Sequence, residues 1–167
     1  MAVPSNQVPK RLSIVPDGAH VQWHLAKEEF ATDYLFDKVP YHKGAIAGQA
    51  VGNQVWALWT HGYYARPGAA DTNNNVLYIL RLVVEGDETA TRIPSHAAKR
   101  PPKHVYDSLL QSLKAALDAA QAEAAEWKLH VVKLWDPTPL VVDMLGQISG
   151  LEYHIVEREQ EEIASLM

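Results

Sequence analysis

The stretch VLYILRLVVE, residues 76–85, constrains the fold more than any other part of this sequence. Apolar residues fill both its odd and its even positions, whereas a strand with one face in water alternates apolar and polar residues. The run therefore predicts a central strand that is covered on both faces. Arg81 is its only charge before Glu85.

The segments on either side of this run predict its neighbours in the sheet. A long amphipathic pattern over 103–127 leads into a second apolar run at 129–135, and strand–helix–strand in this order predicts a βαβ unit with parallel strands. Upstream, QVWALWTHGYY at 54–64 is separated from the central strand by a turn-rich stretch, so the two are predicted to pair antiparallel. The two-residue period places Trp56 and Trp59 on opposite faces.

The remaining patterns complete a single α/β (α+β) domain over residues 11–167, preceded by a flexible arm at 1–10. The sheet is predicted to be mixed and mostly antiparallel, with helices on both faces. The further elements are a strand at 11–16, a helix over 19–34 capped by Asp17, a Gly/Ala-rich strand at 43–50, a short helix stopping at Gly150, and a last strand at 151–156.

Composition excludes several classes of protein. The net charge of −5 argues against a non-specific nucleic-acid binder. The absence of cysteine excludes disulfides and thiolate zinc sites. No apolar run has the length of a membrane-spanning helix, and the N-terminus lacks a signal-peptide core, so a cytoplasmic protein without membrane contact is expected. The start at Met1 suggests a free-standing chain.

His20, His24 and Glu28 stand four residues apart and therefore share one face of the first long helix. Two imidazoles and a carboxylate at this spacing can bind zinc, bind a substrate or act as acid and base. The motif has no fourth ligand in sequence, which favours a solvent-exposed helix face. No metal site is predicted.

His61, Tyr63 and Tyr64 form an aromatic end to the strand that contains Trp59. An imidazole and two phenols offer proton donors and acceptors to a small molecule. The alternative is that these rings only cover the core at the end of a hairpin.

Arg81 cannot lose its proton, and burying it unpaired is costly. It must therefore meet a carboxylate, meet an anionic ligand or reach an open face; the candidate carboxylates are Glu28, Glu29 and Asp136. Asp136 itself follows the second parallel strand, at the carboxyl edge where open α/β sheets bind ligands. It is either a general base or the cap of the helix that begins near Thr138.

Several separate words of the sequence, in the same order, carry a family resemblance: WHLAKEEF, GAIAG, VWALWTHGYY, LYILRLVVE, AAQAEAAEWKLHVVKLWDPTP and EREQEEIASLM. They resemble the C-terminal GNAT-like region of fungal lysine N6-acetyltransferases. The resemblance implies the GNAT acyltransferase fold, a mixed sheet splayed between its fourth and fifth strands. It also implies a groove beside the splay, which the ends of the strands at 54–64 and 76–85 would face.

The sequence departs from the GNAT pattern where acetyl-CoA is normally held. The family cradles the pyrophosphate on backbone amides of a Gly-rich turn before the long helix. Here the corresponding segment has a single glycine, Gly86, and Pro101 and Pro102 remove amide donors at the start of the helix. Lys99, Arg100 and Lys103 would contact phosphates only if coenzyme A binds. No cofactor is therefore expected, with acetyl-CoA as the alternative.

Three functions remain open on this basis. The first is a repurposed biosynthetic enzyme of the cyclase or isomerase type with a small-molecule pocket. Its catalytic residues would be His61, Tyr63, Tyr64 and Asp136, and its substrate-binding residues Arg81, Trp59, His24 and Glu28. The second is an N-acyltransferase that uses acetyl-CoA. The third is a non-catalytic accessory or dimerisation domain, in which case a homodimer is the expected assembly.

Overall fold

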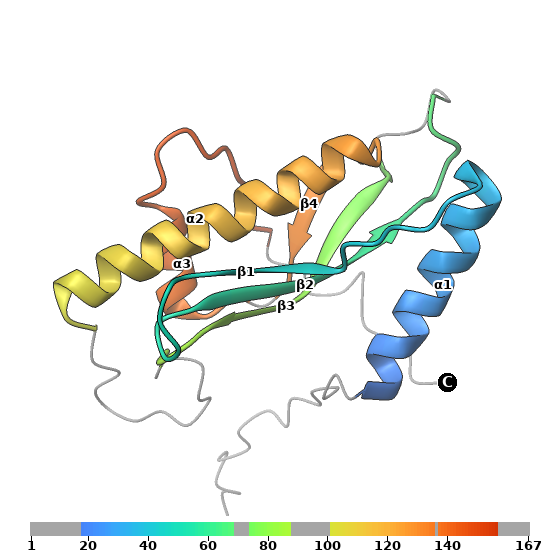
Figure 1. The fold of residues 1–167 in the computed structure, drawn as a ribbon. Coiled ribbons are helices and arrows are strands. Elements are labelled where there is room, and N and C mark those ends of the chain that lie inside the picture. The colour runs from blue at the N-terminus through green and yellow to red at the C-terminus, as the bar shows by residue number, and fades with distance from the viewer. Residues whose placement is uncertain (1–17, 69–73, 88–100, 136, 157–167) are drawn as a thin grey trace, which may run out of the picture.

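The computed structural model describes residues 18–68, 74–87, 101–135 and 137–156 (Figure 1). Within these ranges the chain forms three helices and four strands. In order they are α1 (Gly18–Phe36), β1 (Gly44–Ala47), β2 (Val55–Gly62), β3 (Val76–Val84), α2 (Lys103–Glu126), β4 (Val131–Leu134) and α3 (Pro139–Leu145).

The four strands form one mixed sheet in the order β1-β2-β3-β4. β2 pairs antiparallel with both β1 and β3, and β3 pairs parallel with β4. The helix α2 makes the crossover between the two parallel strands, as Figure 1 shows. These pairings confirm the predicted βαβ unit and the predicted antiparallel neighbour.

One residue of β3 has no counterpart in β2. Leu58 lies opposite Arg81, but the next residue, Trp59, lies opposite Ile79, so Leu80 is extra and forms a β-bulge. An extra residue reverses the face to which the following side chains of a strand point.

Because of the bulge, both halves of β3 send apolar side chains into the core beneath α2: Leu77, Ile79, Leu82 and Val84. Arg81 falls on the opposite face, where it is exposed and its guanidinium carbon lies 5.8 Å from the centroid of the Trp56 ring. The prediction that both faces of this strand are covered is therefore wrong at Arg81. The uninterrupted apolar run reflects the bulge as well as burial.

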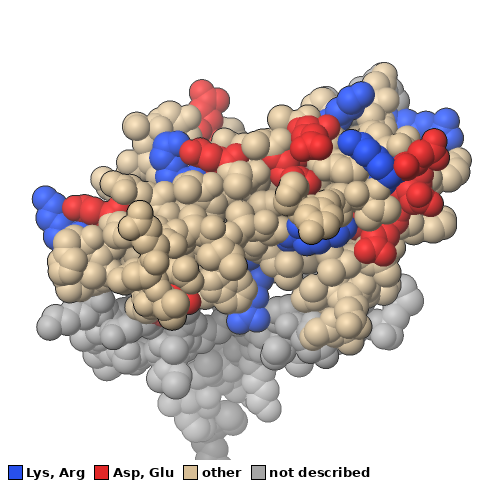
Figure 2. Space-filling view, in the orientation of Figure 1, with Lys and Arg blue, Asp and Glu red and all other residues tan. Residues whose placement is uncertain are grey.

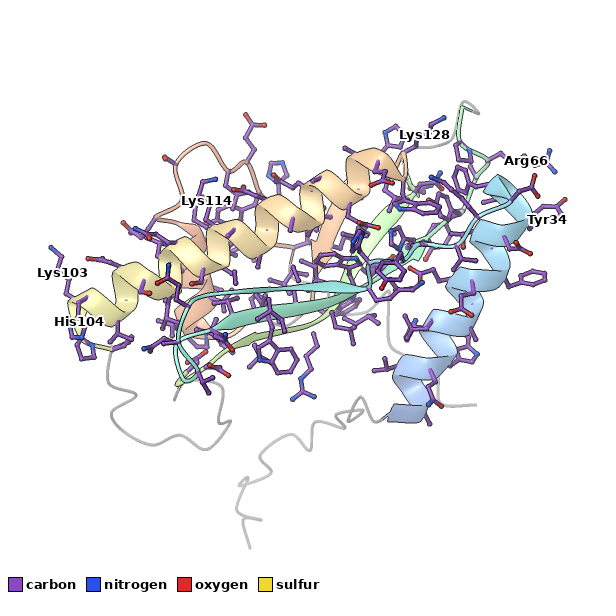
Figure 3. The ribbon with its side chains drawn as sticks, in the orientation of Figure 1. Tyr34, Arg66, Lys103, His104, Lys114 and Lys128 are labelled. Carbon is purple, nitrogen blue, oxygen red and sulfur yellow. The ribbon has the colours of Figure 1, made fainter. Side chains whose placement is uncertain are left out.

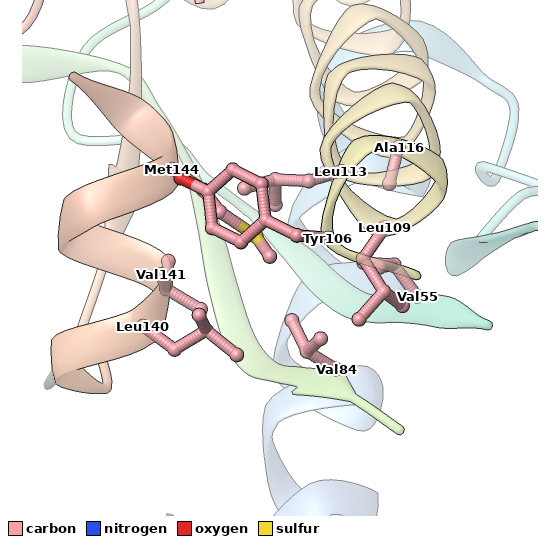
Figure 4. Close-up of a cluster of buried hydrophobic side chains, with 9 residues drawn as sticks. All are labelled: Val55, Val84, Tyr106, Leu109, Leu113, Ala116, Leu140, Val141 and Met144. Atoms are coloured by element: carbon pink, nitrogen blue, oxygen red, sulfur yellow. The ribbon is translucent and has the colours of Figure 1, made fainter. Parts of the chain in front are cut away.

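The core beyond the end of β4 is filled by α3. β4 pairs only with Val76–Ile79, so β3 continues beyond its parallel neighbour. Figure 4 shows α3 and α2 side by side over the ends of β2 and β3, with apolar side chains from all four elements in contact. The side chains that α3 contributes are buried: Leu140, Val141 and Met144.

The helix α1 lies beside the second half of β2, which β1 does not reach because it pairs only with Val55–Leu58. The buried hydroxyl of Thr60 donates a hydrogen bond to the carbonyl oxygen of His24 over 3.4 Å. Thr60 belongs to the face of β2 that points away from α2. Helices therefore contact both faces of the sheet, as predicted.

The chain after α3 differs from the sequence prediction. Residues 151–156 form no strand; Ile155 and Val156 are exposed, so apolar composition alone was a misleading signal there. α3 ends at Leu145, before the expected stop at Gly150. The predicted arm at 1–10, the strand at 11–16 and the cap Asp17 lie outside the described residues.

Candidate functional site

A carboxylate from α1 takes the place of a neighbouring strand along part of β2. The backbone N–H of His61 donates a hydrogen bond to Oε1 of Glu28 over 2.8 Å. β1 ends before this position, so the edge of β2 would otherwise leave an unpaired amide. Glu28 is 1% exposed, which shows that the expectation of a solvent-exposed helix face is wrong at this residue.

The ring of His61 lies between two carboxylates. Its Nδ1 contacts Oε1 of Glu28, and its Nε2 lies 3.1 Å from Oε1 of Glu123 on α2. All three side chains are buried. A neutral imidazole has one N–H and ionised carboxylates have none, so satisfying both contacts requires one additional proton. We call Glu28, His61 and Glu123 the carboxylate–histidine cluster.

Two basic residues before β1 flank this cluster. Lys43 forms an ion pair with Oε2 of Glu28, and Nδ1 of the exposed His42 lies 3.7 Å from Oε2 of Glu123. Burial by itself raises the pKa of Glu28, but the hydrogen bonds from His61 and Lys43 and the charge of His61 together outweigh it. The pKa of Glu28 therefore lies below its ordinary value of 4.5.

Aromatic rings pack beside the cluster. The hydroxyl of Tyr63 donates to the carbonyl oxygen of Trp127 over 2.8 Å. The ring of Phe36 contacts both, with centroids 5.3 Å from Tyr63 and 5.5 Å from Trp127. Burial raises the pKa of Tyr63 well above its usual range, and the negative charges of Glu28 and Glu123 raise it further.

An open hollow of about 440 Å³ lies at the far end of α1, next to Phe36. Figure 3 shows Tyr34, Arg66 and Lys128 gathered there, where the end of α1 approaches the last turn of α2. Its volume falls within the range of small-molecule sites. The hollow is lined by Tyr34, Leu35, Phe36, Arg66, Pro67 and Lys128.

Two cations line this hollow, which we call the basic hollow. Among the described residues no carboxylate lies within ion-pair distance of Arg66 or Lys128. Arg66 donates a hydrogen bond to the hydroxyl of Tyr34 over 3.1 Å. On the face drawn in Figure 2, basic and acidic side chains lie interspersed.

Lys128 has a left-handed backbone, with φ of 56°. It follows the last residues of α2, and the N–H of Leu129 donates back to the carbonyl of Ala124 over 2.8 Å, which closes the helix. Glycine is the usual residue at this position because a side chain makes the left-handed conformation costly.

The other predicted site residues do not line the basic hollow. Trp59 is buried, and its indole N–H donates to the carbonyl of His42 over 3.2 Å. The ring of His24 packs edge-on against Trp23, with centroids 5.0 Å apart. Arg81 lies on the sheet face opposite His61.

Tyr64 lies at the hairpin end with its ring exposed, and its hydroxyl is 3.4 Å from that of Tyr78. The buried amide of Asn75 holds this end together. It accepts from the backbone N–H groups of Tyr64 and Ala65 over 2.9 and 3.1 Å and donates to the carbonyl of Ala65.

Asp136, Lys99 and Arg100 lie outside the described residues. Thr138 caps α3, since its hydroxyl oxygen accepts from the N–H of Val141 over 3.3 Å. Lys103 is exposed at the start of α2, at the end remote from the basic hollow (Figure 3).

Sequence reasoning missed Glu123, Arg66 and Lys128. A signal for Glu123 was present: it lies three residues after Ala120 and four before Trp127, on the apolar stripe of its helix. A charge on such a stripe requires a buried partner. Arg66 and Lys128 follow secondary-structure elements and carry no comparable pattern.

Most of the segment where the family holds acetyl-CoA, residues 88–100, lies outside the described residues. α2 begins directly after Pro101 and Pro102, and Pro102 makes no side-chain cap. In the described parts of the chain, no three His, Asp or Glu side chains are grouped so as to hold a metal ion. None of the described helices is long and apolar enough to cross a membrane.

Comparison with known proteins identifies one family. Residues 1–167 match the family model described as the LYC1 GNAT-like C-terminal domain. No curated protein and no solved structure matches the chain significantly. The match confirms the resemblance seen in the sequence words.

Proposed function

The chain belongs to the family of LYC1 GNAT-like C-terminal domains, and on that premise we propose that it binds a small anionic molecule in the basic hollow. The observation that carries the proposal is the pair of cations, Arg66 and Lys128, which line the hollow without a carboxylate partner among the described residues. Leu35, Phe36 and Pro67 add apolar surface. This combination suits a carboxylate with a short apolar body.

The proposal favours binding over cyclase or isomerase chemistry. Of the four predicted catalytic residues, His61 is buried between carboxylates and the hydroxyl of Tyr63 is bonded to a backbone carbonyl. Tyr64 does not line the hollow, and Asp136 lies outside the described residues. Of the residues that line the hollow, Tyr34 is the one with a hydroxyl group. A reaction there would require Tyr34 or the ligand itself to move protons.

The packing of α3 supports a function that does not use acetyl-CoA in the usual way. The family resemblance implies a sheet that is splayed between the two parallel strands, with the pyrophosphate of the coenzyme held before the long helix. Beyond the end of β4, that side of β3 is packed with buried side chains of α3, including Leu140 and Met144. Inserting a pantetheine arm there would require separating α3 from the core.

The binding proposal is tested by calorimetric titration with hexanoate and with hexanamide, which has nearly the same shape without the charge. Hexanoate should bind and hexanamide should bind at least about tenfold more weakly, since a lost charge contact is worth roughly 1.4 kcal/mol. Arg66→Gln and Lys128→Gln should each weaken hexanoate binding by a similar factor.

Lys114→Gln is the matched control for these variants. Lys114 lies on α2 away from the hollow and pairs with Asp118 over 2.6 Å. Its substitution should leave hexanoate binding unchanged. Equal binding of the acid and the amide, or full binding by Arg66→Gln, would show that the hollow is not an anion site.

A second candidate function, self-association, is favoured by the outer face of α1. Trp23, Phe30 and Tyr34 are spaced by seven and four residues and therefore form one stripe. Their side chains are 59%, 79% and 70% exposed. Contiguous exposed aromatic surface of this kind marks interaction sites, and the same stripe on a second copy is the occupant that we propose.

Sedimentation equilibrium over a range of protein concentrations tests this second function. The chain should dimerise, and Phe30→Ser should shift it to monomer. Tyr41→Ser is the control, because Tyr41 is 91% exposed but lies outside the stripe. A chain that stays monomeric at the highest concentrations would exclude this function.

A further inference from the structure

The carboxylate–histidine cluster and the basic hollow are built on the same three elements. Glu28, His61 and Glu123 come from α1, β2 and α2. The hollow is lined by the end of α1, by residues that follow β2 and by a residue that follows α2. One residue from each element thus joins the cluster, and the same elements end at the hollow.

Trp127 connects the two places directly. Its ring packs against the ring of His61, with centroids 5.4 Å apart, and against Phe36, which lines the hollow. Its neighbour in sequence is Lys128. The contact between His61 and Glu123 therefore lies about one helical turn from Lys128, which lines the hollow.

The two carboxylates are not held equally. Glu28 also binds Lys43 and the backbone N–H of His61. For Glu123, the further partner among the described residues is the exposed His42, whose Nδ1 lies 3.7 Å from Oε2. If the additional proton is lost, one ring nitrogen of His61 and the carboxylate oxygen opposite it both present lone pairs, so no hydrogen bond joins them. The contact with Glu123 is the one that breaks.

We propose that the additional proton of the carboxylate–histidine cluster controls anion binding in the basic hollow. With the proton present, Glu123 is tied to His61 and holds the end of α2, and with it Lys128, in the binding position. Loss of the proton as the pH rises releases this end of the helix, so anion affinity falls. This inference rests on the proposed function of the hollow.

The charged and titratable groups around His61 come from every element packed against it: Glu28 from α1, His42 and Lys43 from the segment before β1, Tyr63 from β2 and Glu123 from α2. Tyr63 keeps its proton, because burial and the nearby carboxylates raise its pKa. Lys43 stays paired with Glu28. His42 is exposed and its Nδ1 lies 3.7 Å from Oε2 of Glu123, so it requires a control variant.

The test follows hexanoate affinity by calorimetry from about pH 6 to about pH 9.5, where the ligand stays ionised. In parallel, NMR follows the indole N–H of Trp127 and the ring of His61 without ligand, with the indole signal assigned by Trp127→Phe. Affinity should fall by roughly tenfold as the pH rises. The Trp127 signal should shift with the same midpoint as the His61 ring.

Glu123→Gln is the decisive variant. A glutamine amide can donate to the unprotonated Nε2 of a neutral His61, so it holds the contact without the additional proton. Its pH profile should be flat for both affinity and the Trp127 signal. His42→Gln should keep the pH dependence of the wild-type chain.

The outcomes separate the two proposals. If the Trp127 signal of the wild-type chain does not titrate, or titrates identically in Glu123→Gln, the inference is overturned whatever the affinity. If hexanoate binds at no pH while Trp127 titrates only in the wild-type chain, the cluster controls the end of α2 and the anion function is what fails. The pH titration of the Trp127 signal is measured on the wild-type chain, so it still tests the inference if Glu123→Gln does not fold.

Discussion

Both the backbone N–H and the ring of His61 are directed at the carboxylate of Glu28, a residue 33 positions earlier in the chain. This single carboxylate therefore satisfies an edge amide of β2 and a buried imidazole at the same time. It also binds Lys43. The attachment of α1 to the sheet depends on a charged residue in a place where an apolar anchor is more usual.

Replacing Glu28 by alanine should lower the free energy of unfolding by about 3–5 kcal/mol, because it leaves His61 and Lys43 without their acceptor. Urea denaturation followed by circular dichroism measures the loss. Glu29→Ala is the matched control, since Glu29 is the exposed neighbour on the same helix, and it should change stability by less than about 0.5 kcal/mol. Equal effects of the two substitutions would contradict the structural role of Glu28.

The lowered pKa of Glu28 predicts a dependence of stability on acid. A carboxyl group whose pKa is lower in the folded than in the unfolded state stabilises the fold at pH values above its ordinary pKa, here 4.5. That contribution disappears as the pH falls through the folded-state value. Urea unfolding across this acidic range should give a steeper loss for the wild-type chain than for Glu28→Gln. Parallel curves would show that Glu28 is not the group responsible.

Lys128→Gly should stabilise the fold and weaken anion binding together. Glycine adopts the left-handed backbone of this position without the cost of a side chain, a difference of about 1 kcal/mol. The same change removes one of the two cations of the basic hollow. Thermal melts and calorimetry measure the two effects. Lys128→Ala separates them, because it removes the charge and should give no gain in stability.

Acetyl-CoA should bind more weakly than micromolar, if it binds at all. The prolines at the start of α2 and the buried side chains of α3 both oppose the usual mode. Calorimetric titration is the direct measurement. A micromolar dissociation constant, about −8 kcal/mol of binding free energy, would favour the acyltransferase alternative. Weakening by Lys103→Gln would then locate the phosphates at α2.

The sheet could be predicted because its signals are local. Apolar runs, a turn-rich hairpin and a long amphipathic helix fix the order and direction of β2, β3 and β4 without any tertiary information. The carboxylate–histidine cluster could not be predicted in the same way. Its members lie 33 and 62 residues apart, and no local pattern shows which residue is the partner of which.

Arg81 shows a different limit. A guanidinium in an apolar strand needs a partner or an open face, but the sequence does not show which face of the strand is open. The bulge at Leu80 decides that, and the exposed side of the strand receives Arg81. A bulge cannot be recognised in an uninterrupted apolar run, because both the odd and the even positions of such a run are apolar.

The bulge also divides β3 into two halves, and the alternation of core-facing and outward-facing residues is reversed between them. The side chains that face the core beneath α2 stand at odd positions before Leu80, namely Leu77 and Ile79, and at even positions after it, namely Leu82 and Val84. A relative with one residue fewer in this strand would need the opposite alternation in one half. Aligning such sequences by residue number would pair core positions with surface positions, so they should be aligned by the face that each half presents.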